Sequence, residues 1–179
     1  MVGWDWYYLS TVMDDYSRYI ISWLLSPTME AGDVTQTLDE ALTLTGVESV
    51  KVRHRPRLLS DNGPAYVSGE MREHLDERGM AHMRGRPYHP QAQGKIERYH
   101  PSMKNVVKLE HYYFPWEREA ALRDFVSYYN NRRAHEALDN VTPADAYCGR
   151  RHEVLTERQR INRLTMQSRR KENYAKLSA

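Results

Sequence analysis

The first apolar stretch of the chain predicts two antiparallel strands. Residues 4–25 are rich in Trp, Tyr, Ile and Val, and only the polar segment 14–18 interrupts them. Aromatic and β-branched residues favour strands, and a short polar segment between two such runs is typical of a hairpin turn. We therefore expect a β-hairpin over residues 4–25, with Asp14 and Asp15 in its turn.

After Pro27 the apolar residues recur at helical rather than strand spacing. A helix with one apolar face is predicted there, and Thr28 can cap its first turn. That face should cover the sheet. Its residues are Val34, Leu38, Ala41, Leu42 and Thr45.

Short apolar runs and turn residues organise the next segment. Residues 58–60 predict a strand that ends at Asp61, before an Asn-Gly turn. A helix with Met71 and Leu75 facing inward should follow and end at Gly79. Residues 80–83 predict another strand.

Helices are expected in the second half of the chain. The first follows a Pro/Gln/Gly loop and carries Glu97 one turn in. Pro101 lies in its interior, where proline offers no N–H and crowds the preceding turn, so we expect a kink. The next helix spans about 117–133, and a further start signal begins at Thr142. The apolar side of the 117–133 helix is expected to hold Ala121, Phe125, Tyr128 and Tyr129.

Charge is distributed unevenly, although the net charge of the chain is only +2. Residues 150–179 carry nine basic and three acidic side chains. We expect a mostly polar helix whose apolar anchors are Leu155, Ile161 and Leu164, with the charge of a phosphate-binding arm. The basic residues are Arg150, Arg151, Arg158, Arg160, Arg163, Arg169, Arg170, Lys171 and Lys176.

Length and composition narrow the class of protein. A chain of 179 residues is long enough for one domain and a modest appendage. The single Cys148 excludes a disulfide framework within one chain and fits a reducing compartment. No run approaches 18 apolar residues and no signal-peptide pattern begins the chain, so a cytoplasmic protein without a membrane span is expected.

Two carboxylates in separate motifs carry the candidate chemistry. Asp61 lies in LLSDNG at residues 58–63, and Glu97 lies in YHPQAQGKIER at residues 88–98, with 35 residues between the two acids. Carboxylate oxygens are the ligands that hard ions such as Mg²⁺ prefer. A turn acid and an exposed helical acid are the alternatives that either motif alone would leave open.

These segments resemble the catalytic core of the retroviral-integrase and insertion-sequence transposase superfamily. The resemblance covers residues 3–147 and includes WYYLSTVMDDYSR at residues 6–18, YNNRRAHEAL at 129–138 and TPAD at 142–145. It implies an α/β, RNase H-like mixed sheet flanked by helices, and Asp61 and Glu97 as catalytic ligands of Mg²⁺ or Mn²⁺. It also divides the chain into a core over residues 1–148 and a basic helical tail over residues 149–179.

The chain departs from the family pattern at its beginning. The family's first catalytic Asp lies on a first strand, upstream of the segment that begins here at Gly3. We expect that strand to be missing, which would leave a gap in the sheet and make the core N-terminally truncated and inactive alone. Asp5, Asp14 and Asp15 are the candidate stand-ins, and turn acids are the simpler interpretation.

The expected partner is DNA, with a homo-oligomer or a full-length transposase subunit as a protein partner, and no membrane. Lys104 resembles the family's DNA-contacting lysine, and a solvated basic stripe is the alternative. The candidate DNA-binding residues are Lys95, Lys104, Lys108, Arg132 and Arg133.

Three functions remain open from the sequence. The leading one is a transposase or integrase core that performs metal-dependent DNA strand transfer. The second is a non-catalytic DNA-binding or subunit-interaction module of a mobile element. The third, an RNase H-like nuclease outside transposition, fits residues 129–138 less well, because that signature is typical of mobile-element proteins.

Overall fold

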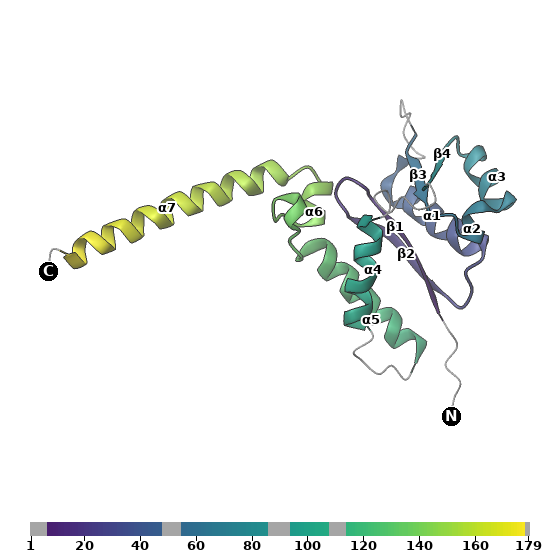
Figure 1. Ribbon diagram of the computed structural model, residues 1–179, viewed down its shortest axis with the longest axis horizontal. Helices are drawn as coiled ribbons and strands as arrows, with labels where there is room; N and C mark the ends of the chain where they lie inside the picture. The colour runs from purple at the N-terminus through teal and green to yellow at the C-terminus, as the bar shows by residue number, and fades with distance from the viewer. Residues whose placement is uncertain (1–6, 48–54, 86–93, 108–113, 178–179) are drawn as a thin grey trace. The chain divides into compact units, whose positions relative to one another are not determined.

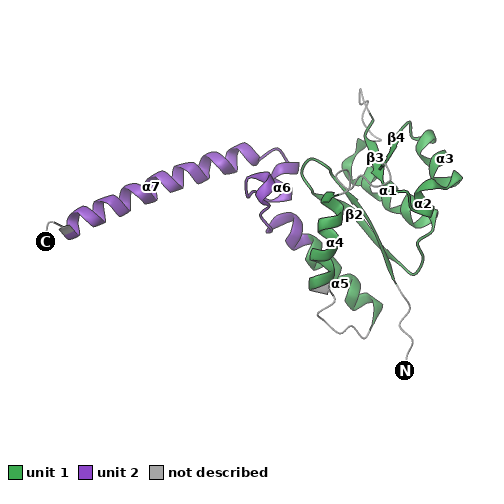
Figure 2. Ribbon diagram, viewed as in Figure 1, with its two compact units in different colours: residues 1–126 green, residues 127–179 purple. Residues whose placement is uncertain are grey.

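A computed structural model describes residues 7–47, 55–85, 94–107 and 114–177. The chain divides into two compact units, residues 1–126 and 127–179, and the division falls within one helix (Figure 2). The boundary between core and tail at residue 148 is a separate expectation and stays a prediction. No helix in the described ranges combines the length and apolar character needed to cross a membrane.

The predicted hairpin is confirmed in the first unit. Strands β1 (Tyr8–Met13) and β2 (Ile20–Ser26) pair in antiparallel register. In the turn, Oδ2 of Asp14 accepts hydrogen bonds from the N–H and the hydroxyl of Ser17, at 2.7 and 2.6 Å. Asp14 is therefore a turn former, because its carboxylate replaces backbone partners that the turn leaves free.

Helix α1 (Ala31–Thr45) buries the face that its spacing predicts, except that Thr45 is only half-buried. The predicted cap at Thr28 is wrong, since the N-cap residue is Glu30, whose N–H donates to Asp33 Oδ2 at 3.0 Å. The Thr28 hydroxyl donates to the same carboxylate at 2.7 Å. Hydrogen bonds from Thr28 and, to a smaller extent, from Ser26 lower the pKa of Asp33. The Asp33 carboxylate is therefore the common hydrogen-bond acceptor for the residues that precede α1.

The strand expected before Asp61 and the strand expected after Gly79 are both present, as β3 (Arg57–Ser60) and β4 (Ala81–Arg84). They pair in parallel. The short helix α2 (Pro64–Val67) and helix α3 (Gly69–Glu77) connect them. Gly79 follows α3 with φ of +61°, a left-handed conformation that glycine adopts without strain.

Within the described residues the strands form two separate two-stranded sheets, β1–β2 and β3–β4 (Figure 1). A single mixed sheet would need another strand to join them. The gap that the sequence predicts in the sheet stays a prediction. The family's fold class is nevertheless recognisable, because the helices and strands follow the expected order.

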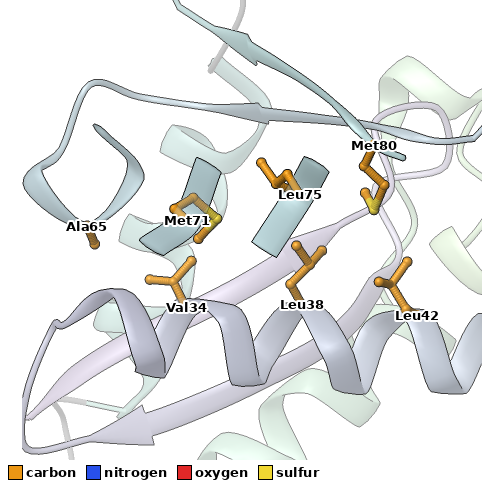
Figure 3. Close-up of a cluster of buried hydrophobic side chains, with 7 residues drawn as sticks. All are labelled: Val34, Leu38, Leu42, Ala65, Met71, Leu75 and Met80. Atoms are coloured by element: carbon orange, nitrogen blue, oxygen red, sulfur yellow. The ribbon is translucent and has the colours of Figure 1, made fainter. Parts of the chain in front are cut away.

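One apolar cluster joins α1 to the segment that carries Asp61. Residues of α1 pack against α2, α3 and Met80, which directly precedes β4, and Met71 is fully buried among them (Figure 3). α1 also packs on β1 and β2. Burying one such side chain contributes about 1.5–3 kcal/mol, so this cluster holds α2 and α3 against α1. Its members are Val34, Leu38, Leu42, Ala65, Met71, Leu75 and Met80.

Helix α4 (Gly94–Val107) carries Glu97 in its first turn and continues through Pro101. Helix α5 (Pro115–Asn131) buries a face formed by Leu122, Phe125, Val126 and Tyr129. The inward position predicted for Tyr128 is wrong, because this side chain is 50% exposed. The buried residues follow Leu122 at positions +3, +4 and +7, which is one face of a helix, and Tyr128 lies off this face toward solvent.

The second unit contains a 3-10 turn, η3 (Glu136–Leu138), and helices α6 (Pro143–Tyr147) and α7 (Arg151–Leu177). The predicted cap of α6 is confirmed, since the Thr142 hydroxyl accepts from the N–H of Asp145 at 3.2 Å. Leu155 packs on a small cluster around Leu138, as predicted for an anchor. Ile161 and Leu164 are not anchors, because each is 49% exposed and α7 has left that cluster by then.

Candidate functional site

Asp61 lies directly after β3, on an exposed turn that its own carboxylate stabilises. Oδ1 of Asp61 accepts a hydrogen bond from the N–H of Gly63 at 2.7 Å. A Cβ on Gly63 would come within 2.9 Å of that oxygen, so a side chain there would displace the carboxylate. The charge of Asp61 also raises the pKa of Tyr66, although burial of the phenol is the larger cause. Asp61 is thus held in position through Oδ1, and no hydrogen bond from the described residues engages its Oδ2.

A hydrogen-bonded network ties the Asp61 turn to the end of β4. The Ser60 hydroxyl lies 2.8 Å from Nε2 of His82 and donates to the carbonyl of Asp61 at 2.9 Å. Because the hydroxyl has one proton, Nε2 of His82 is then the protonated nitrogen and donates to Ser60. On the other side, Asn62 donates to the carbonyl of Gly85 at 2.9 Å.

The pKa of His82 lies below its ordinary value, mainly because the ring is partly buried and secondly because Arg84 is close. Both effects disfavour a second proton on the ring. A neutral His82 fits the single hydrogen bond that it makes to Ser60. The network around Asp61 is therefore built without an additional charge.

Glu97 and Lys104 lie on one exposed face of α4, seven residues apart. Both side chains act on His100 between them. The pKa of His100 is lowered mainly by burial and then by the charge of Lys104, while the charge of Glu97 opposes that shift. The structure thus brings together a candidate ligand and a candidate DNA-binding cation.

Lys95 has a different environment from the one expected of a DNA contact. Its ammonium donates to the carboxylate of Asp15 at 2.7 Å and to the carbonyl of the same residue at 2.6 Å. Asp15 belongs to the hairpin turn, so this pair joins the start of α4 to the hairpin. Positioning α4, and Glu97 with it, is the role that these contacts support.

The remaining predicted cations are at the end of α5 or outside the described residues. Arg132 is exposed there. The guanidinium of Arg133 lies over the ring of Tyr129, 5.6 Å from its centroid. Such a cation–π contact leaves the N–H groups at the edge of the guanidinium free for other partners. Lys108 lies outside the described residues.

The described residues do not form a complete metal site. No three His, Cys, Asp or Glu side chains among them lie close enough to hold one ion. Asp61 and Glu97 are two exposed carboxylates, and carboxylate oxygens are suitable ligands for a divalent cation. Two such side chains are fewer than the three that a complete protein site would need.

Sequence reasoning missed the Ser60 and His82 pair. In the parallel register His82 lies opposite Leu58, so its side chain is on the same face as that of Ser60, two residues further along β3. A hydroxyl next to Asp61 and a histidine in the neighbouring strand are visible signals. Only the register of the two strands makes them a pair.

Comparison with known proteins agrees with these motifs. Residues 1–90 match the family described as integrase core domain, and residues 78–143 match a second family of the same description. The Gag-Pro-Pol polyprotein of mouse mammary tumor virus is 32% identical over 113 residues, which cover 60% of this chain and 6% of the polyprotein. The transposase for insertion sequence element IS629 of Shigella sonnei is 30% identical over 140 residues, or 78% of this chain and 45% of the transposase.

Solved structures show the same fold. The catalytic core domain of BIV integrase is 23% identical with a TM-score of 0.59, and the match covers 86% of this chain and 93% of that core. The HTLV-2 integrase catalytic core, solved with magnesium in a trimeric form, is 19% identical with a TM-score of 0.60. That match covers 78% of this chain and 84% of the HTLV-2 chain. The chain therefore belongs to the integrase core domain family, with the RNase H-like fold of its relatives.

Proposed function

We propose that this chain is the core of a DNA strand-transfer enzyme of a mobile element, with Asp61 and Glu97 as two of its metal-binding catalytic residues. The observation that carries the proposal is the placement of Asp61. It is an exposed carboxylate, fixed at a strand end by Gly63, Ser60 and Asn62. A fixed acid at such a position suits catalysis, because its geometry is prepared before a ligand arrives.

The proposed cofactor is Mg²⁺ or Mn²⁺. Both are hard ions that bind carboxylate oxygens, and magnesium is present in the solved HTLV-2 core. Since no three His, Cys, Asp or Glu side chains among the described residues lie close enough to hold one ion, we propose that an acid outside those residues completes the site and is required for full activity. Strand transfer by this polypeptide alone is then expected to be weak or absent.

The proposed partners are DNA and further copies of an integrase-like chain. Lys104 is exposed on the face of α4 that carries Glu97, and an exposed lysine there suits a phosphate group near the catalytic acid. Dimeric and trimeric forms of the HTLV-2 core support an oligomer as the working state. The cytoplasmic setting expected from the sequence stays a prediction.

Metal binding tests the two acids directly, independently of catalysis. Titration of the full chain with Mn²⁺, followed by isothermal calorimetry, is expected to show one weak site. Asp61→Asn and Glu97→Gln should each abolish it. The matched controls Asp76→Asn and Glu119→Gln remove exposed helical acids that are already paired with arginines, and they should leave the site unchanged. Equal Mn²⁺ binding in all four variants would contradict the assignment.

Strand transfer is then measured with end-bearing DNA and Mg²⁺ or Mn²⁺. Low activity that disappears in both Asp61→Asn and Glu97→Gln would show that another acid completes the site. Robust activity that survives either substitution would refute the proposed catalytic residues.

The second candidate function is a non-catalytic DNA-binding or subunit-interaction module. The incomplete ligand set of the described residues favours it. It predicts DNA binding or association with a complete integrase-like subunit, without any Mn²⁺ site at Asp61. The calorimetric titration therefore separates the two functions.

A further inference from the structure

The two halves of α7 use their arginines differently. In the first half, Arg151 pairs with the carboxylate of Asp139. Arg158 donates to the carbonyls of Asp139 and Asn140, at 2.9 and 3.0 Å. Asp139 and Asn140 form a turn with φ of 57° and 58°, which directs both carbonyls toward the helix. These contacts fix the start of α7 to its own unit.

The second half of α7 makes no such contacts. Every side chain described from residue 163 to residue 176 is exposed. Five cations lie there with one acid, Glu172, and no hydrogen bond or ion pair joins these cations to another described residue. The cations are Arg163, Arg169, Arg170, Lys171 and Lys176. Like charges at this density repel one another, and an opposite charge from outside would relieve that repulsion.

The cations are not spread evenly around the helix. Arg163 and Arg170 are seven residues apart, so they are nearly aligned along the helix at a separation of about 10.5 Å, and Lys171 lies about 80° around the helix from Arg163. The three cations therefore occupy one side of the helix, within an arc of about 100°. Gln167 is at the spacing that belongs to the same face. Glu172 comes nine residues after Arg163, which is two and a half turns at 3.6 residues per turn, so the acid is on the opposite face.

A second copy of the helix is a poor occupant for this surface. Ile161 and Leu164 could begin an apolar seam, and the positions one heptad further are Ser168 and Lys171. A coiled coil requires apolar residues to continue at those positions. Two copies would also bring like charges together. A polyanion has the complementary charge over the whole face.

We propose that the face of α7 formed by Arg163, Arg170 and Lys171 binds the phosphate backbone of duplex DNA. This site deepens the proposed function, and it rests on that function only in taking DNA as the partner. The first half of α7 attaches the helix to the turn at Asp139 and Asn140, and the second half contacts the DNA. A short helix without tertiary contacts is only marginally stable in water, and the second half of α7 is such a segment. Phosphate binding should therefore also increase the helicity of this half.

The test uses the full chain and a mixed-sequence duplex of about 30 base pairs, whose Kd is measured over a range of salt concentrations. Each phosphate contact contributes about 0.9 to the slope of log affinity against log salt. The triple variant Arg163→Gln, Arg170→Gln, Lys171→Gln should therefore flatten the slope by about 2.7. Glutamine has nearly the helix propensity of arginine and lysine, so α7 is preserved.

The matched control is the triple variant Arg72→Gln, Arg123→Gln, Arg160→Gln. It removes the same charge from exposed arginines that are paired with acids in their own helices. Its slope should stay close to that of the unchanged chain. Circular dichroism of the chain with and without the duplex should show a helical gain that the first triple variant loses.

The outcomes separate this inference from the proposed function. Equal slopes for the two triple variants would show a general charge effect and overturn the site. A change of oligomeric state in the first triple variant, measured by sedimentation with an unchanged slope, would assign the face to a protein contact instead. A chain that binds no duplex even at low salt would refute the DNA partner itself, and with it both proposals.

Discussion

Removing the Ser60 hydroxyl is expected to loosen the turn that holds Asp61. Ser60 is only 6% exposed, and its oxygen bonds both His82 and the carbonyl of Asp61. In Ser60→Ala both bonds are lost, and Nε2 of His82 is left without its partner. The backbone bond from the N–H of Gly85 to the carbonyl of Ser60 remains.

The magnitude follows from those two bonds. Each intramolecular hydrogen bond contributes about 0.5–1.5 kcal/mol net, so their loss should lower the free energy of unfolding by about 1–3 kcal/mol. His82 is only partly buried, and water can replace part of what Ser60 supplied. The loss should therefore fall in the lower half of that range.

Urea unfolding of the full chain gives the total effect, and hydrogen exchange at Gly63 and Gly85 locates it. Exchange at both amides should accelerate in Ser60→Ala. Ser102→Ala is the matched control, because its hydroxyl bonds only a carbonyl of its own helix at an exposed position. It should change stability by less than about 0.5 kcal/mol.

A double-mutant cycle with His82→Ala isolates the bond between the two side chains. Residues in direct contact are expected to show a coupling energy of at least about 0.5 kcal/mol. A coupling energy near zero, together with unchanged exchange at Gly63, would refute the idea that Ser60 and His82 position Asp61.

Three further predictions concern stability. Met71→Ala, which empties a fully buried position in the cluster on α1, should cost about 2–5 kcal/mol in urea unfolding, whereas Met166→Ala on exposed α7 should cost little. Thr142→Ala removes the N-cap of α6 and should cost about 1 kcal/mol, with Thr142→Ser retaining most of it. The pKa values of His82 and His100 are both lowered on folding, so the unfolded chain binds more protons and stability should fall as pH drops below about 6.5. His82→Gln and His100→Gln should each flatten that decline between pH 7.5 and 5.5, and an undiminished slope in both would contradict the assignment.

Local pattern was sufficient for most elements of the fold. The hairpin, α1 and α3 were predicted because an element that buries one face has apolar residues at regular spacing, every two residues in a strand and every 3.6 residues in a helix. Where several polar residues could cap the same helix, the pattern does not show which of them is the cap. Thr28 and Glu30 both precede α1, and only the position of the Asp33 carboxylate makes Glu30 the cap.

The candidate site was predicted only in part, for a related reason. Asp61 and Glu97 are visible because each has its own motif. The pairing of Ser60 with His82 depends on strand register, and the pairing of Lys95 with Asp15 joins residues 80 positions apart. Neither distance leaves a local trace in the sequence. The exposed state of Ile161 likewise depends on where α7 extends beyond the cluster around Leu138.

The separation of β1–β2 from β3–β4 has a consequence for the order of folding. The hairpin closes over a six-residue turn, an event on the scale of about 1–10 μs. The parallel pair cannot form until the chain between its strands has wound into α2 and α3. No backbone ladder joins the two sheets in the described residues. Helix α1 packs on β1 and β2 and also on α2 and α3, so its side chains couple the two sheets. A weakened α1 should therefore give two unfolding transitions where the intact chain gives one.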